Sequence, residues 1–351
     1  MTPDGDLVLN DGSGLFCQAG GFHIDPWSPV PCAVITHAHS DHARGGSERY
    51  IATPETADVM RSRISAELNI ETVAYGQTVR MGTVQIRLEP AGHVLGSAQI
   101  VVTPDDGPTW CITGDYKVEP DRTCASFQPQ ACDVLVTEST FGLPVFRWRS
   151  DDEVVRSMNA WRAENAAAGR TSVLLCYAFG KAQRVVASLD PSVGPIGLHG
   201  SVRNMCEVYA RHGISFPETV HANAENADVL RAGGTVVAPP SALTGPWLRR
   251  FVSPIGGMRT AMVSGWMALR GRRRWRGTDT GFVLSDHADW PGLIDTIRAT
   301  GAKRVLATHG YASQLARYVR EELRIDAGVL PTRYGDAEEA EADIIADVER
   351  A

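Results

Sequence analysis

The chain has 351 residues, of which 43% are hydrophobic and 21% are charged. This length and composition are typical of a folded protein with one large domain or two ordinary ones, and they exclude a low-complexity chain. No apolar run approaches the roughly 18 residues that a membrane span needs, and the chain does not start with a basic segment followed by an apolar core. We therefore expect a cytoplasmic protein without a membrane partner.

The net charge of −7 is unevenly distributed along the chain. Residues 336–351 contribute −6 of it, so the rest of the chain is close to neutral. Ile344, Ile345 and Val348 recur in this tail at near-helical spacing, which indicates a short solvated helix more than an acidic arm that binds a partner. The acidic balance therefore does not exclude a polyanionic substrate.

The first predicted strand that leads to chemistry spans residues 31–36, a short apolar and partly β-branched run. It ends where four metal-capable side chains occur within six residues. Each of them needs its own partner when buried, and a metal ion supplies that partner more readily than core packing does. The sequence therefore predicts a metal site on a strand-end loop, with a solvated polar loop as the alternative. The four side chains are those of His37, His39, Asp41 and His42.

Further aspartate and histidine residues follow predicted strands along the chain, after a helix expected around residues 55–68. His93 is flanked by Gly92 and Gly96, which suit a backbone that approaches an ion or a phosphate closely. Taken singly, each of these residues fits a surface or satisfied polar group. Taken together, they predict one convergent site that contains Asp25, His93, Asp115 and His309.

The middle of the chain contains no such strand-end ligands, but it alternates predicted helices and strands. This alternation indicates a small α/β unit with a parallel sheet. At one strand-to-helix turn, Gly180 and Lys181 could hold a scissile or terminal phosphate through backbone N–H groups and the helix dipole. The predicted elements are 153–168, 171–177, 195–198, 202–212 and 234–239.

Residues 270–276 concentrate five arginines and one tryptophan. Guanidinium groups bind phosphates in a bidentate manner, and an interleaved indole offers a stacking face for a base. An exposed loop kept soluble by its charge explains the composition equally well, but the position shortly before His287 favours contact with a substrate. The candidate nucleic-acid-binding residues are Arg270, Arg272, Arg273, Arg274, Trp275 and Arg276.

The ordered motifs resemble those of the metallo-β-lactamase fold, through Asp25, the H-x-H-x-D-H run, Gly92-His93 and Gly114-Asp115. Residues 136–142 (V-T-E-S-T-F-G) and 284–289 (L-S-D-H-A-D) resemble the first two signature motifs of the β-CASP nuclease branch, and His309-Gly310 resembles the third. That branch contains the pre-mRNA 3′-end processing endonuclease, RNase J and the DNA repair nuclease Artemis. The likeness covers about residues 10 to 335 and extends to compact bacterial β-CASP proteins described as DNA-ligase-associated exonucleases.

The resemblance implies an α/β protein in which a β-CASP α/β cap domain is inserted into an αββα metallo-β-lactamase sandwich. Residues 1–145 and 276–351 would form the sandwich, and residues 146–275 the cap.

The resemblance also implies two divalent ions, for which the imidazole and carboxylate ligands suit zinc or manganese without choosing between them. Asp25 would orient a ligand histidine. Asp115 would bridge the ions, with His37, His39 and His93 on the first and Asp41, His42 and His309 on the second.

By the same resemblance, His287 would be the general acid that protonates the leaving alkoxide, and Glu138 would fix its tautomer. Zinc lowers the pKa of its bound water to about 7, so hydroxide would be available to attack phosphorus; Asp41 and Asp115 would take part through the ions. We therefore expect a two-metal phosphodiesterase acting on nucleic acid. A DNA exonuclease in repair or end processing is favoured, with an ATP-dependent DNA ligase or helicase as the candidate partner.

Three other functions stay open. His309 stands where RNA-processing members usually carry histidine and the eukaryotic DNA-processing members usually carry valine, so an RNA-cleaving exonuclease or endonuclease of the RNase J type is the main alternative. A small-molecule metallo-hydrolase would have no use for the cap or for His287. A non-catalytic subunit would be expected to lack some ligands, and none is missing.

Overall fold

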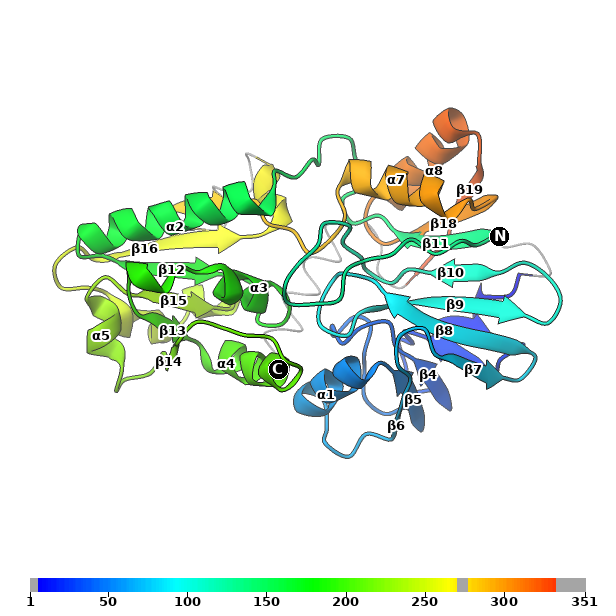
Figure 1. Ribbon diagram of the computed structural model, residues 1–351, viewed down its shortest axis with the longest axis horizontal. Coiled ribbons are helices and arrows are strands. Elements are labelled where there is room, and N and C mark those ends of the chain that lie inside the picture. Colours follow the sequence, from blue (N-terminus) through cyan, green and yellow to red (C-terminus); the bar gives the residue numbers. More distant parts are fainter. Residues whose placement is uncertain (1–5, 270–276, 333–351) are drawn as a thin grey trace. The chain divides into compact units, whose positions relative to one another are not determined.

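The structure is a computed structural model that describes residues 6–269 and 277–332. The chain forms two compact units (Figure 1): unit 1 comprises residues 1–147 and 287–351, and unit 2 comprises residues 148–286. Unit 2 ends eleven residues after the predicted inserted segment, because Thr280–Phe282 (β17) pairs with the last long strand of its sheet. No helix in the described ranges is long and apolar enough to cross a membrane.

Unit 1 contains two sheets. The first has six strands in the order β1-β2-β3-β4-β5-β6, and helix α1 (Pro54–Arg63) connects the parallel strands β5 and β6. Thr53 caps this helix by accepting a hydrogen bond from the Thr56 N–H, and Pro54 suits its first turn. The strands are β1 (Leu9–Asn10), β2 (Leu15–Cys17), β3 (Phe22–Ile24), β4 (Cys32–Val34), β5 (Arg49–Ala52) and β6 (Ile70–Thr72).

The second sheet of unit 1 has seven strands in the order β19-β18-β11-β10-β9-β8-β7. Helices α7 (Trp290–Thr300) and α8 (Ala312–Tyr318) accompany it, and η5 (Val319–Leu323) follows α8. The strands are β7 (Thr78–Met81), β8 (Val84–Pro90), β9 (Ala98–Pro104), β10 (Trp110–Ile112), β11 (Val134–Glu138), β18 (Arg304–Thr308) and β19 (Asp326–Val329).

The alternation of side chains along these strands creates two apolar layers. Trp110 and Val136 point into a core shared with residues of the first sheet, such as Phe22. Their neighbours Cys111 and Leu135 point to the opposite face and pack with residues of α7 and α8. Because successive strand residues face opposite sides, one run of apolar residues serves both the sheet-on-sheet core and the helical layer.

The strands that lead to the candidate site end at common edges. β11 pairs in parallel with β10 on one side and with β18 on the other. In the other sheet, β3 and β4 also pair in parallel. Parallel neighbours bring the residues after their carboxyl ends together. The residues at or just after those ends are Asp25, His37, Asp115, Glu138 and His309.

Unit 2 has one six-stranded sheet in the order β14-β13-β15-β12-β16-β17, and every pairing in it is parallel. This confirms the predicted α/β unit with a parallel sheet. Helices α2, α3 and α4 contribute to one apolar core with strand residues such as Leu174 and Val237. The remaining elements are α2 (Asp151–Ala167), β12 (Thr171–Leu175), α3 (Lys181–Ser188), η1 (Pro191–Val193), β13 (Ile196–Leu198), α4 (Gly200–Arg211), β14 (Val220–His221), α5 (Ala227–Arg231), β15 (Thr235–Ala238), η2 (Pro240–Leu243), η3 (Pro246–Phe251), β16 (Met258–Val263) and η4 (Gly265–Ala268).

Candidate metal centre

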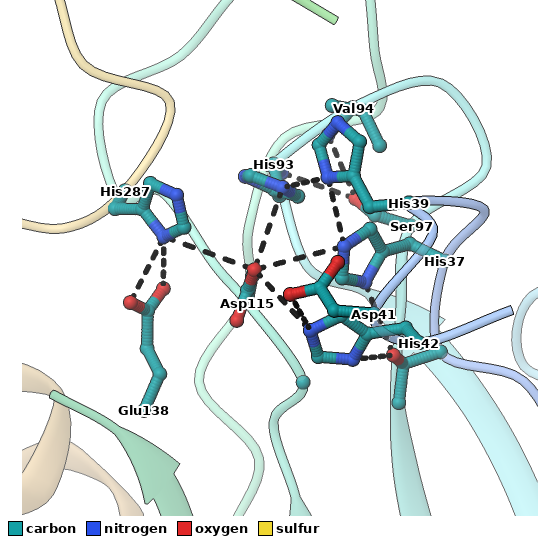
Figure 2. Close-up of polar contacts among 12 residues, drawn as sticks. His37, His39, Asp41, His42, His93, Val94, Ser97, Asp115, Glu138 and His287 are labelled. Carbon is teal, nitrogen blue, oxygen red and sulfur yellow. Dashed lines mark hydrogen bonds and ion pairs between the residues drawn. The ribbon is translucent and has the colours of Figure 1, made fainter. Parts of the chain in front are cut away.

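Three predicted ligand histidines converge with Asp115 in unit 1 (Figure 2). His39 Nδ1 lies 3.0 Å from both His37 Nε2 and His93 Nε2. Asp115 Oδ2 lies 3.6 Å from His37 Nε2 and 3.8 Å from His93 Nε2. Ligand atoms each about 2.1 Å from one tetrahedral ion stand about 3.4 Å apart. These four side chains are thus arranged as the first predicted ligand set requires.

A second group shares Asp115 with the first. Ligand atoms of His42, Asp115 and His309 lie within 4.8 Å of one another. His42 Nε2 is 3.5 Å from Asp115 Oδ2 and 3.4 Å from Asp41 Oδ2. This nitrogen is buried and has no hydrogen-bond partner within the described part of the chain. A buried imidazole nitrogen that faces two carboxylates without a hydrogen bond fits a metal ligand.

The tautomers of two ligand histidines follow from Asp25 and Thr36. The Asp25 carboxylate accepts hydrogen bonds from the Thr36 N–H (2.8 Å), from the Thr36 hydroxyl (2.5 Å) and from His42 Nδ1 (2.7 Å). Thr36 Oγ1, having donated to Asp25, accepts from His37 Nδ1 at 3.1 Å. With Nδ1 of each ring donating to these oxygens, Nε2 is the nitrogen that faces Asp115, and it is the one that could bind an ion in place of a proton. This is the contact that an orienting role of Asp25 requires.

Burial makes two of the histidines poor proton acceptors. It lowers the pKa of His37 well below its usual range, and the nearby His42 and His93 lower it further. Burial and His42 also lower the pKa of His309. Both rings are therefore uncharged at neutral pH, which is the form of imidazole that binds a metal ion.

His42 and Asp115 form the charged centre of the cluster. Burial disfavours the charged form of His42, but the carboxylates of Asp41, Asp115 and Asp25 outweigh it and raise the pKa of His42 well above its usual range. Burial also disfavours the Asp115 carboxylate, but the imidazoles of His42 and His287 hold the pKa of Asp115 well below its usual range. The pocket thus favours positive charge beside Asp115, and a divalent cation would supply it.

His287 stands next to this cluster. Its Nδ1 lies 2.9 Å from Glu138 Oε2 and 3.0 Å from Oε1, and its ring centroid lies 4.7 Å from that of His93. Glu138 is buried at the end of β11 and also accepts a hydrogen bond of 2.7 Å from the Tyr116 N–H. The predicted pair is therefore in contact, and the carboxylate is itself held in place.

Two site residues have a left-handed backbone that non-glycine residues rarely adopt. Asp25 has a φ of 44° and His309 a φ of 54°. Each follows the end of a strand, and the turn directs the side chain into the cluster. Such backbone strain persists only where surrounding contacts stabilise the unfavourable conformation, and it is concentrated at functional sites.

Gly92 and Gly114 permit close packing beside the ligands. A Cβ at Gly92 would lie 2.4 Å from the Lys117 carbonyl oxygen, and one at Gly114 would lie 2.7 Å from Thr36 Cβ. Both also have positive φ angles, of 74° and 55°. The partner that Gly92 approaches is the protein's own backbone, whereas the sequence suggested an ion or a phosphate.

No protein-family model matches the chain. Over 309 residues, or 88% of the chain, it is 31% identical to a protein named probable DNA ligase from Opitutus terrae, and the match spans 30% of that protein. Over 123 residues, or 34% of the chain, it is 33% identical to the endoribonuclease YSH1 of Kluyveromyces lactis, and the match spans 16% of that protein. The chain is a relative of the β-CASP metallo-β-lactamase nucleases. It matches less than a third of the length of either relative.

A solved structure of a protein of unknown function from Enterococcus faecalis V583 is also similar. It superimposes with a TM-score of 0.55 over 87% of this chain and 80% of that one, at 12% sequence identity. This likeness is one of fold alone and agrees with the mixed α/β architecture of this β-CASP relative.

Two side chains that contact this candidate centre were not identified from the sequence. Thr36 connects Asp25 to His37, and Ser97 Oγ accepts hydrogen bonds from the His93 and Val94 N–H groups at 3.0 and 3.2 Å. Only their positions in the sequence could have indicated them. Thr36 directly precedes the histidine run, and Ser97 directly follows Gly96. Ser and Thr in such places commonly bond to the local backbone.

The predicted phosphate-binding turn has protein partners in the structure. The Gly180 N–H donates to Gln183 Oε1 at 2.8 Å, and Lys181 Nζ lies 2.8 Å from Asp286 Oδ2. The side chain of Lys181 is 5% exposed. A phosphate at this turn would have to compete with both contacts, which the isolated sequence could not show.

The predicted nucleic-acid-binding segment, Arg270, Arg272, Arg273, Arg274, Trp275 and Arg276, lies outside the described residues. Its role stays a prediction from composition.

Proposed function

We propose that the protein is a two-metal phosphodiesterase that hydrolyses nucleic acid, and that it is a DNA exonuclease in repair or end processing. The observation that carries this proposal is the contact between His287 and Glu138 beside the histidine cluster. An alkoxide leaving from a phosphodiester needs a proton, and a positioned imidazole can supply it. The endoribonuclease relatives add independent support for a nucleic-acid substrate.

The donor set fits two divalent ions, zinc or manganese, that share Asp115. When bound, such ions lower the pKa of water and neutralise charge on the reacting phosphate. The first ion would be held by His37, His39 and His93, and the second by Asp41, His42 and His309.

The protein's own residues would handle the leaving group. With Glu138 accepting a hydrogen bond from His287 Nδ1, the imidazolium form of the ring would donate its second proton from Nε2 to the leaving oxygen and become neutral. The Tyr116 N–H orients the Glu138 carboxylate, so the ring is held through two successive hydrogen bonds. The imidazole is thus preorganised before a substrate arrives.

The choice of DNA rests on the match to a protein named DNA ligase, which covers 88% of this chain. The same match is the reason for proposing an ATP-dependent DNA ligase, or a helicase of the same pathway, as a partner. RNA processing is the second candidate, because endoribonucleases named YSH1 match and because His309 occupies a position that resembles RNA-processing members. In this proposal unit 1 corresponds to the αββα sandwich and unit 2 to the β-CASP cap.

Matched end-labelled DNA and RNA strands, each incubated with zinc or manganese, test this function. We expect stepwise shortening of DNA from one end, and no hydrolysis by an Asp115→Ala variant. Faster cleavage of RNA would replace the first candidate by the second. Failure to hydrolyse either polymer with any metal, while nitrophenyl esters are cleaved, would indicate a small-molecule hydrolase.

A further inference from the structure

A buried ion network in unit 2 surrounds Asp286. Lys181 Nζ lies 2.8 Å from Asp286 Oδ2, and Arg184 Nη1 lies 2.9 Å from Oδ1. The side chains of Lys181, Arg184 and Asp286 are 5%, 6% and 7% exposed. Each oxygen of the Asp286 carboxylate therefore has its own cationic partner. Two such contacts fix the orientation of the carboxylate better than one contact would.

Arg184 extends this network to the backbone and to a second acid. Its Nη1 also donates to the Ser285 carbonyl, and its Nη2 donates to Asp151. The two cations are thus balanced by the two carboxylates of Asp286 and Asp151. A neutral cluster of paired charges is the arrangement in which buried ions are tolerated.

The network ends one residue before His287. The peptide bond between Asp286 and His287 is where the chain passes from unit 2 to unit 1. Lys181 and Arg184 hold the residues before this bond, and Glu138 holds the imidazole after it. Consecutive Cα atoms are about 3.8 Å apart, so a shift of Asp286 is transmitted to the His287 backbone.

We propose that Lys181 and Arg184, acting through Asp286 and the Ser285 carbonyl, are positioning residues for proton transfer by His287. This proposal rests on the proposed general-acid role of His287. It gives Lys181 a function other than the phosphate contact that the sequence suggested. Misplacement of a reacting group by about 1 Å can cost about 100-fold in rate. A small displacement of residues 285–287 should therefore lower turnover.

The variant Asp286→Asn keeps the side-chain shape and removes the charge that both cations bind. On an end-labelled strand we expect kcat to fall by about 10-fold to 100-fold. We expect KM to change by less than about 3-fold, because the substrate contacts are intact. A nitrophenyl phosphodiester, whose leaving group needs no proton, should be hydrolysed at nearly the wild-type rate.

A charge-balanced variant and a matched control separate positioning from loss of stability. Lys181→Met/Asp286→Asn leaves Arg184 paired with Asp151, so the cluster stays neutral and the same kinetic defect should appear in a folded protein. Thr235→Val removes another buried hydrogen bond of unit 2, the one from Arg162 Nε at 2.8 Å. Thr235→Val should lower the free energy of unfolding, but it should not slow nucleic-acid hydrolysis more than hydrolysis of the nitrophenyl phosphodiester.

Coupling to His287 decides the proposal. In a His287→Ala background, Asp286→Asn should have no further effect on kcat, and a crystal structure of Asp286→Asn should show His287 Nδ1 beyond hydrogen-bond distance of Glu138. Additive effects, equal slowing of both substrates, or an unmoved imidazole would overturn it. If His287→Ala alone shows no leaving-group dependence, the proposed general-acid role of His287 fails instead, and the crystallographic distance still tests the positioning.

Discussion

At the scale of single residues, hydrogen bonds to carboxylates decide which ring nitrogen each histidine presents. Asp25 accepts a hydrogen bond from His42 Nδ1, and Glu138 accepts one from His287 Nδ1. The first leaves Nε2 facing Asp115, and the second leaves Nε2 available for proton transfer. A carboxylate that accepts from Nδ1 thus orients His42 for the proposed metal binding and His287 for the proposed acid catalysis.

Asp25→Asn should weaken the second metal position. The change removes the anionic acceptor for His42 Nδ1, and loss of such a partner typically costs about 10-fold to 100-fold in metal affinity. Competition titration with a chromophoric chelator would measure it, with the first ion little affected. Asp11→Asn is the matched control, because Asp11 makes a similar carboxylate–imidazole contact to His23 Nε2, at 2.9 Å, and His23 belongs to none of the candidate metal-binding groups among the described residues. Equal losses in both variants would contradict the orienting role.

His287→Ala should separate metal binding from proton transfer. General acid catalysis is worth about 10²-fold to 10⁴-fold, so turnover of nucleic acid should fall by this factor, while a nitrophenyl phosphodiester is largely spared. Glu138→Gln should give a milder form of the same defect. Metal analysis is the control: His287, Glu138 and Asp115 are close enough to hold an ion, so loss of metal from His287→Ala would make it a ligand.

At the scale of elements, the turn after β10 shows how backbone conformation supports the ligands. Gly114 precedes Asp115, has a φ of 55°, and packs against Thr36. The turn therefore places the Asp115 carboxylate near the hydroxyl that contacts both Asp25 and His37.

Gly114→Ala should destabilise the protein and loosen the metal centre. The left-handed backbone costs an alanine about 1–2 kcal/mol, and the clash with Thr36 adds to it. Gly76→Ala is the control, because Gly76 has a φ of 75° with no atom within 4 Å of an added Cβ. Urea unfolding should show a larger loss for Gly114→Ala, and zinc affinity should fall in that variant alone. Equal behaviour would mean that Thr36 simply moves aside.

The arginine-rich segment supports a prediction that rests on sequence alone. Replacing Arg272, Arg273 and Arg274 with glutamine should weaken binding of unrelated single strands alike. Each lost phosphate contact should reduce the salt dependence, the slope of log K against log salt, by about 0.7. Fluorescence anisotropy over a salt series would measure this. An unchanged affinity and slope would identify an exposed loop that merely confers solubility.

At the scale of the whole molecule, metal binding should stabilise the fold, because the ligands come from strand ends of both sheets of unit 1. An ion at 1,000 times its Kd adds about 4 kcal/mol, and each kcal/mol shifts Tm by about 2–4 °C, so chelation should lower Tm by about 8–16 °C for each ion that is removed. Metal analysis should approach two ions per chain. Asp115→Ala should lose both, and its Tm should not respond to metal. A wild-type protein that saturates at one ion would contradict the binuclear site.

Sequence patterns alone predicted the metal-capable residues of the candidate centre and the parallel sheet of unit 2. These features follow from short-range patterns: metal-capable side chains at the ends of apolar strands, and alternation of strand with helix. His93, Asp115 and His309 are far apart in the chain, yet each was identified by its local context: His93 by its flanking glycines, and Asp115 and His309 by their positions at strand ends.

The pairing of buried polar groups depends on tertiary packing and could not be predicted from the sequence. Lys181 faces Asp286 across more than a hundred residues of sequence, and Thr36 links Asp25 to His37. The end of unit 2 was likewise decided by the pairing of β17 with β16. The physical reason is that a lysine after a strand-end glycine looks the same whether it meets a phosphate or a carboxylate. The partner of a buried charge depends on which elements pack together, and that is a property of the fold.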